Sequence, residues 1–182
     1  SDMIGMEGIE AKHLICYTYP EDQDLARVGV TGLFLGHYLP WDGLSNTLIA
    51  QANGFITYDK VVEGSMVNYE NLDNHQTGVH DYFKFLKFGF GRATDLACLH
   101  IRRNRLTRQD GLDAVKRLDG RFPWEYLGKS LEDILRPMNM TVDEFIGLCD
   151  KFTNKKIFKR DVSGALMKAR DGNLTKINYD NA

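Results

Sequence analysis

The residues best suited to chemistry lie between positions 71 and 108, where aromatic, glycine and basic residues occur close together. Between positions 84 and 108 a single acid, Asp95, stands among seven basic residues: Lys84, Lys87, Arg92, Arg102, Arg103, Arg105 and Arg108. The formal net charge of the whole chain is −2, so this positive excess is local. Such an excess beside a helix start is typical of a site for a phosphorylated ligand. A solvated helix face has the same composition, so charge alone leaves both interpretations open.

Two glycines, Gly89 and Gly91, directly precede a predicted helix that begins near Arg92. They would let the backbone approach an anion, the first helical turn would present N–H groups, and Arg92 would add a forked donor. A corner between two helices that needs glycine for a positive φ fits equally well. Because the glycines follow a predicted helix rather than a strand, they lack the context of a dinucleotide-binding fingerprint.

Lys84 and Lys87 lie three residues apart, and therefore on one face of a helix predicted over 81–88. We expect both lysines and Arg92 to converge on one positively charged groove, with His80 as a hydrogen-bonding residue. Two simpler interpretations stay open, since Asp81 can pair with Lys84 and such lysines are often solvated. We predict no metal site, because no HExxH or other compact ligand spacing joins His75, His80, Asp73 and Asp81.

The first third of the chain alternates in the manner of an α/β protein. The apolar runs 13–17 and 31–36 are predicted to be buried strands, with a helix over 21–28 between them and another over 44–53 after them. This order favours a parallel βαβ arrangement. Trp41 and Asp42 follow the second run, at the carboxyl edge where open α/β sheets bind ligands. We expect them to contact substrate and to face the same surface as Lys84, although a tryptophan covering the core edge would look the same.

Beyond the α/β portion, the pattern is irregular over 55–78, with one short strand near 55–62, and helical from residue 79 onward. Capping pairs mark three helix starts: Thr107 with Asp110, Ser130 with Asp133, and Thr141 with Glu144. The sequence thus predicts a partial α/β layer over 4–62, a mainly helical domain over 63–171 and a flexible tail over 172–182.

Composition excludes several classes of protein. With 43% hydrophobic and 26% charged residues the chain is an ordinary globular sequence, and its pI of about 6.2 argues against a dedicated nucleic-acid binder. No apolar run approaches the roughly 18 residues of a membrane span. The three separated cysteines, Cys16, Cys98 and Cys149, provide neither a disulfide framework nor a CxxC pair and suit a reducing cytoplasm.

Several segments together resemble the N-acetyl sugar amidotransferases, PP-loop ATP-pyrophosphatases of lipopolysaccharide and nonulosonate biosynthesis. They are LGHYLPWDG (35–43), ANGF (52–55), residues 69–111 and LDG (118–120), and the most specific is HDYFKFLKFGFGRATD (80–95). The resemblance covers about residues 10–160. It implies a parallel nucleotide-binding sheet of the HUP/PP-loop type, followed by a helical substrate-side domain. The implied reaction converts the N-acetyl group of a nucleotide-linked sugar to an acetamidino group, using ATP with Mg²⁺ and ammonia from a glutaminase subunit.

The resemblance also implies roles for residues. Lys84, Lys87 and Arg92 are the expected catalytic residues, and the expected substrate-binding residues are Trp41, Asp42, His80, Asp81 and Asp95. The 182 residues contain no SGGxDS phosphate loop, so the chain resembles the C-terminal half of such an enzyme and is not expected to turn over alone. A homodimer is compatible with this interpretation. The alternatives are a non-catalytic domain that docks a glutaminase or a second copy, and, less favoured, an RNA-binding module that uses residues 102–108.

Overall fold

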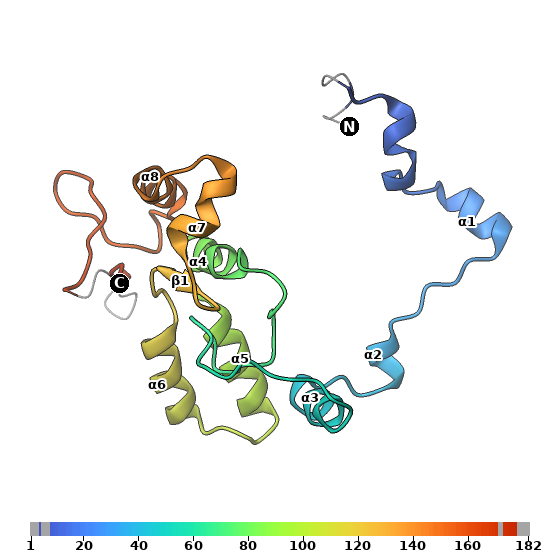
Figure 1. Ribbon diagram of the computed structural model, residues 1–182, viewed down its shortest axis with the longest axis horizontal. Coiled ribbons are helices and arrows are strands. Elements are labelled where there is room, and N and C mark those ends of the chain that lie inside the picture. Colours follow the sequence, from blue (N-terminus) through green and yellow to red (C-terminus); the bar gives the residue numbers. More distant parts are fainter. Residues whose placement is uncertain (1–3, 5–7, 171–172, 178–182) are drawn as a thin grey trace. The chain divides into compact units, whose positions relative to one another are not determined.

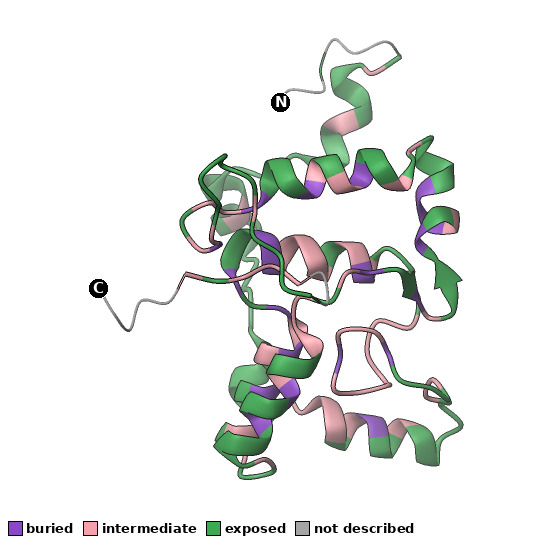
Figure 2. Ribbon diagram, turned by 90° about the vertical axis from the view of Figure 1, so that its left-hand side faces the viewer, coloured by how far each residue is buried: buried purple, intermediate pink, exposed green. Residues whose placement is uncertain are grey.

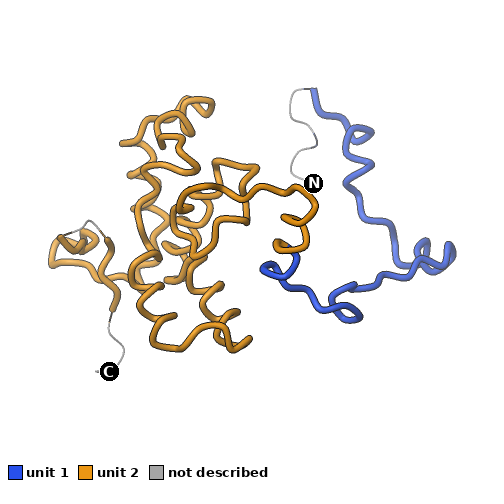
Figure 3. The backbone as a smooth tube through the Cα atoms, turned by 60° about the horizontal axis from the view of Figure 1, so that its bottom comes forward, with its two compact units in different colours: residues 1–46 blue, residues 47–182 orange. Residues whose placement is uncertain are grey.

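The computed structural model describes residue 4, residues 8–170 and residues 173–177. The chain separates into two compact units, residues 1–46 and 47–182 (Figure 3). The predicted flexible tail over 172–182 lies outside the described residues except for 173–177, which pair with earlier segments through isolated bridges.

The first unit consists of short helical segments joined by extended chain, and none of its described residues is buried. Its elements are the 3₁₀ helix η1 (Ala11–Tyr17), α1 (Asp22–Val28) and α2 (Leu35–Tyr38). The helix predicted over 21–28 is confirmed. The strands predicted at 13–17 and 31–36 are wrong: the first run is η1, and the second is extended chain that leads into α2. Among the described residues neither run has a neighbouring strand, and local bonds such as Thr18 N to Ile15 O (3.2 Å) form instead.

Helix α3 (Gly43–Ala52) agrees with the helix predicted over 44–53 and is followed by a long irregular loop. The short strand predicted near 55–62 does not form. Instead, Tyr58 and Asn68 close a loop through a 2.9 Å backbone bond and a 2.7 Å bond from the Asn68 amide to the Tyr58 carbonyl.

The second unit is mainly helical, as predicted (Figure 1). Its helices are α4 (Thr77–Phe88), α5 (Arg92–Arg102), α6 (Arg108–Leu118), α7 (Leu131–Leu135), the 3₁₀ helix η2 (Arg136–Met138) and α8 (Val142–Phe152). The three predicted caps are confirmed, since the side chains of Thr107, Ser130 and Thr141 accept from the backbone N–H three residues later. α5 packs against α6, and α4 packs against α8.

A two-stranded antiparallel hairpin interrupts the helices, contrary to the prediction that all residues after 79 are helical. It pairs β1 (Glu125–Tyr126) with β2 (Lys129–Ser130), and it is the one sheet in the part of the chain that the structure describes. Pro123 has no N–H to donate to a helix, and Leu127 and Gly128 both have positive φ (50° and 75°). Positive φ at both central residues is the signature of a type I′ hairpin turn.

The core of the second unit is rich in aromatic residues, and nearly all of its buried positions lie after residue 77. Figure 2 colours the buried positions of the ribbon purple. Phe85 packs against Phe158 with ring centroids 5.3 Å apart, and Phe145 contacts Phe83 and Phe122 edge to face at 5.7 and 5.8 Å. Aliphatic side chains such as Leu86 fill the spaces between the rings. In the described segments, no helix combines the length and the apolar character needed to cross a membrane.

Candidate functional site

A cavity of about 360 Å³ opens beside α4 and combines apolar walls with several charged groups. Three parts of the chain form it: loop 61–64, the inward side of α4, and residues 117–125 that lead into the hairpin. Its aromatic walls are Tyr82, Phe122 and Trp124. Its charged groups are Glu63, Asp81, Arg117, Asp119, Arg121 and Glu125. Concave apolar sites with a few convergent polar groups are the usual form of a small-molecule site.

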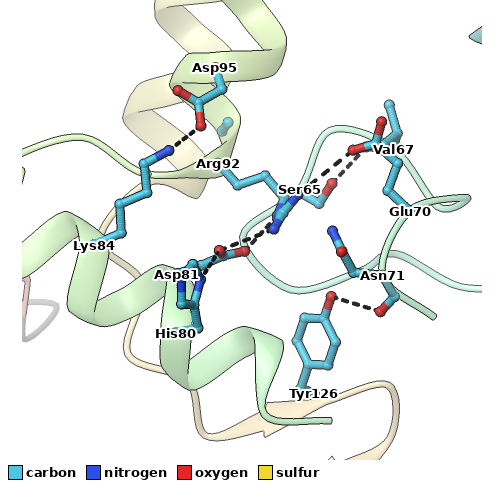
Figure 4. A network of polar contacts seen from close by, with 12 residues as sticks. Ser65, Val67, Glu70, Asn71, His80, Asp81, Lys84, Arg92, Asp95 and Tyr126 are labelled. Atoms are coloured by element: carbon cyan, nitrogen blue, oxygen red, sulfur yellow. Dashed lines mark hydrogen bonds and ion pairs between the residues drawn. The ribbon is translucent and has the colours of Figure 1, made fainter. Parts of the chain in front are cut away.

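Asp81 reaches the cavity from α4 and is held by Arg92 at the start of α5 (Figure 4). The guanidinium donates from Nε to Oδ2 at 2.5 Å and from Nη2 to Oδ1 at 3.1 Å, which is a bidentate pair. The side chain of Arg92 is only 21% exposed and that of Asp81 only 14%. Arg92 also approaches Glu70 at 3.7 Å, and the Asn71 amide, assigned with its oxygen toward the guanidinium, accepts from Arg92 Nη1 at 2.7 Å. Arg92 therefore fastens the loop before α4 to both helices.

The same contacts set the protonation states in this region. Burial lowers the pKa of Arg92, but the hydrogen bond and charge of Asp81 outweigh burial, so the pKa of the guanidinium is raised. Burial raises the pKa of the Tyr126 phenol, whose hydroxyl donates to the Asn71 carbonyl at 3.3 Å. Arg92 is thus a permanent cation whose charge is already matched by acids of its own chain.

The three expected catalytic cations do not converge. Lys84 pairs with Asp95 and lies 4.9 Å from the centroid of the Phe90 ring. Lys87 instead lies over the rings of Phe83 and Phe152, at 6.0 and 5.4 Å. The expectation of one positively charged groove is wrong, because Lys84 and Arg92 are each paired with an acid and Lys87 lies over aromatic rings. The simpler interpretation, in which Asp81 pairs with Lys84, does not hold either, because Asp81 pairs with Arg92 and Lys84 with Asp95.

The N–H groups at the glycine corner are taken by a carboxylate of the chain itself. Asp119, just after α6, accepts from Gly91 N at 2.8 Å, from Ala93 N at 3.1 Å and from the Thr94 hydroxyl at 2.5 Å. A Cβ at position 91 would lie 2.7 Å from Asp119 Oδ1, so glycine is needed for this close approach. The corner therefore joins α5 to the end of α6, and the anion at this helix start is Asp119 rather than a bound phosphate.

Replacing Asp119 tests this role. Asp119→Ala removes three hydrogen bonds and is expected to lower the free energy of unfolding by about 2 kcal/mol, the upper range for a lost helix cap. Asp119→Asn keeps an acceptor oxygen but removes the charge, so we expect it to lower the free energy of unfolding by about half as much. Chemical denaturation measures both, with the exposed Asp113→Ala as the control. A stability of Asp119→Ala equal to that of the unmodified chain would contradict this role.

The remaining expected site residues have simpler surroundings. His80 is 76% exposed and its Nδ1 lies 3.1 Å from Asp81. Asp42 caps α3, accepting from Leu44 N at 3.3 Å and from the Ser45 hydroxyl at 2.8 Å. Trp41 is 71% exposed within the first unit. The expectation that Trp41 and Asp42 face the surface of Lys84 stays a prediction, as do the catalytic and binding roles of all eight residues. In the described ranges no three acidic, histidine or cysteine residues are arranged to hold a metal ion.

A second cavity of about 240 Å³ adjoins the first and shares Tyr82, Phe122 and Trp124 with it. It also contains Cys149, which is buried, and burial raises the pKa of the Cys149 thiol to about 12. Burial likewise raises the pKa of Tyr82, so its phenol stays neutral.

Thiol reactivity reports on this burial. At pH 8 we expect a disulfide reagent such as Ellman's reagent to modify the exposed Cys16 and Cys98 quickly, and Cys149 only after denaturant is added, because the thiolate is the reactive form. Mass spectrometry of the modified peptides identifies each site. Rapid labelling of Cys149 in the native chain would show that the second cavity is open to reagent and that the thiol is not shielded.

Residues 58–170 match the family described as LPS biosynthesis protein WbpG-like, C-terminal domain. The chain belongs to this family. The matched range contains all of α4 to α8 and every residue that lines the two cavities, except Asn173 and Leu174 of the second cavity. It gives the WbpG-like domain a role in lipopolysaccharide biosynthesis, in agreement with the pathway and the C-terminal position that the sequence resemblance implies. No curated protein sequence matches the chain significantly.

Sequence reasoning missed several residues that line the cavity of the WbpG-like domain: Glu63, Tyr82, Asp119, Arg121, Phe122, Trp124 and Glu125. One local signal was present, because the run FPWEY (122–126) combines a proline with aromatic residues and is unsuited to a helix interior. The capping role of Asp119 had no local signal, since its partners lie 25 to 28 residues away.

Proposed function

We propose that the chain is the C-terminal part of an ATP-dependent amidotransferase that converts the N-acetyl group of a nucleotide-linked sugar to an acetamidino group. The family match to a domain of lipopolysaccharide biosynthesis carries this proposal, together with the resemblance of residues 80–95 to the sugar amidotransferases. The cavity beside α4 supports it, because aromatic walls and carboxylates suit a sugar better than a purely apolar ligand.

In the proposed reaction ATP with Mg²⁺ adenylylates the amide oxygen and pyrophosphate leaves. Ammonia from a glutaminase subunit then attacks the amide carbon, and AMP leaves with the former amide oxygen. Within this chain, Asp81 lines the cavity, and the bidentate bond to Arg92 fixes the orientation of its carboxylate. Such a fixed carboxylate can accept a hydrogen bond from the substrate amide N–H or from the incoming ammonia. The glycine corner is filled by Asp119 and so does not hold the phosphates of ATP. We assign those phosphates to a PP-loop and a parallel sheet elsewhere in the complete enzyme.

The test uses the complete enzyme supplied with ATP, Mg²⁺, ammonium and UDP-linked N-acetyl sugars. We expect pyrophosphate release that depends on both sugar and ammonium, and a product in which one oxygen of the sugar is replaced by NH, detected by mass spectrometry. The 182-residue chain alone should release little or no pyrophosphate, because it has no glycine-rich phosphate cradle of the SGGxDS type. Pyrophosphate release without any amidino product would exclude the proposed reaction.

A docking role for the first unit is a second candidate, and one observation favours it. Large apolar side chains are exposed along the unit, among them Tyr17 (84%), Leu33 (69%) and Phe34 (89%). Exposed apolar side chains of this kind, where they gather into a patch, commonly mark an interaction site. This role is compatible with the amidotransferase proposal, in which a glutaminase subunit, a second copy or another part of the enzyme would bind there.

A further inference from the structure

We infer that the cavity beside α4 binds the sugar ring of the substrate on Trp124 and leaves the diphosphate and nucleoside outside. The kind of substrate, a nucleotide-linked sugar, comes from the proposed function, on which this inference rests. The cavity indicates which part of that substrate is bound.

The aromatic wall provides a rigid stacking surface. Trp124 is 63% exposed although it lines both cavities, so a large part of its indole ring is accessible to a ligand. Its other contacts hold it in place: the Phe122 ring centroid is 4.5 Å away, and Phe122 packs edge to face on Tyr82 at 5.3 Å. An exposed aromatic ring that is fixed by packing loses little entropy when a flat apolar surface covers it. The C–H face of a pyranose ring is such a surface.

The polar groups around Trp124 suit the hydroxyl and amide groups of a sugar. Glu63 is positioned by the backbone N–H of Leu127, which donates to its Oε2 at 3.1 Å. A carboxylate can accept about four hydrogen bonds, so this contact leaves capacity for ligand hydroxyls. Arg121, whose Nε donates to the Arg117 carbonyl at 2.8 Å, brings further N–H donors to the same wall. Acceptors and donors thus both line the cavity to which Trp124 is exposed.

The balance of charge explains why the diphosphate is left outside. Four carboxylates line the cavity (Glu63, Asp81, Asp119 and Glu125); because Arg92 offsets Asp81, three of them stand against two guanidinium groups (Arg117 and Arg121). The cations that could offset a diphosphate are engaged elsewhere, Arg92 with Asp81 and Lys84 with Asp95. Like charges brought together in a partly desolvated site repel strongly, so a doubly charged diphosphate is disfavoured there and a neutral sugar is not.

Saturation-transfer NMR on the 182-residue chain tests this inference, with UDP-N-acetylglucosamine, N-acetylglucosamine and UMP as separate probes. We expect saturation on the sugar-ring and acetyl protons of the first two probes and little on uracil. Trp124→Ala should weaken binding of UDP-N-acetylglucosamine about tenfold, which is about 1.4 kcal/mol, and Trp124→Phe should restore most of it. Phe88→Ala is the matched control, since Phe88 is similarly exposed at 60% but lines neither cavity.

Three results would overturn the inference: saturation concentrated on uracil, binding that Trp124→Ala leaves unchanged, or no saturation of any probe. The proposed function is tested separately, by pyrophosphate release and amidino product in the complete enzyme, so the two can fail independently. An active enzyme with saturation on uracil would refute the sugar subsite alone. Sugar binding without any amidino product would refute the reaction alone. A thermal melt of each variant confirms that it is folded.

Discussion

Arg92→Ala is expected to lower the free energy of unfolding by about 3 kcal/mol, because it leaves the carboxylate of Asp81 largely buried without its bidentate partner. The loss should extend to the loop before α4, since Arg92 also holds Asn71 and approaches Glu70. For a chain of this size about 3 kcal/mol corresponds to a decrease in Tm of roughly 9 °C. Differential scanning fluorimetry together with urea denaturation measures both quantities.

Lys84→Ala is the matched control, because Lys84 is also a basic residue of the 80–95 segment that pairs with an acid eleven positions away. Its partner Asp95 is 53% exposed, and an exposed pair contributes only about 0–1 kcal/mol. We expect Lys84→Ala to shift Tm by about 3 °C or less. Equal melting of the two variants would show that Arg92 does not have the structural role assigned to it. Loss of activity in the complete enzyme without loss of stability in Arg92→Ala would support the catalytic role that the sequence predicted.

The helices of the second unit could be predicted because the signals that define them are local. Thr107, Ser130 and Thr141 each cap a helix through a backbone group three residues away, so the sequence contains both partners within one turn. The runs 13–17 and 31–36 are different, because a short apolar run becomes a strand only if another strand pairs with it. Such a partner cannot be inferred from the run itself.

The candidate site was predictable only in part, and the reason is the distance along the chain between interacting residues. The concentration of cations between 84 and 108 is real, but Arg92 meets Asp81 eleven positions earlier and the corner at Gly91 meets Asp119 twenty-eight positions later. These partners neutralise the groups that composition alone assigns to an anionic ligand. The pattern of charges therefore indicates only a region of the chain, whereas the fold decides which charges remain available to bind a ligand.

Gly120→Ala is expected to be among the most destabilising single substitutions near the cavity, at about 3 kcal/mol. Gly120 has φ of 78°, a conformation that costs other residues roughly 1 kcal/mol. A Cβ there would also lie 2.5 Å from Cζ of Phe85, a buried ring that packs on Phe158 and has no room to retreat. Displacing that ring adds about 2 kcal/mol of overpacking strain.

Gly164→Ala separates these two contributions. Gly164 has φ of 88°, but a Cβ there meets nothing within 4 Å, so only the backbone strain of roughly 1 kcal/mol should appear. In urea denaturation we expect the free energy of unfolding of Gly120→Ala to be about 2 kcal/mol lower than that of Gly164→Ala. A near-ultraviolet circular dichroism change confined to Gly120→Ala would report the displaced aromatic ring. If the two variants were equally stable, the contact between Gly120 and Phe85 would not constrain this corner. The segment leading to Trp124 would then owe its position to the Asp119 cap and the hairpin instead.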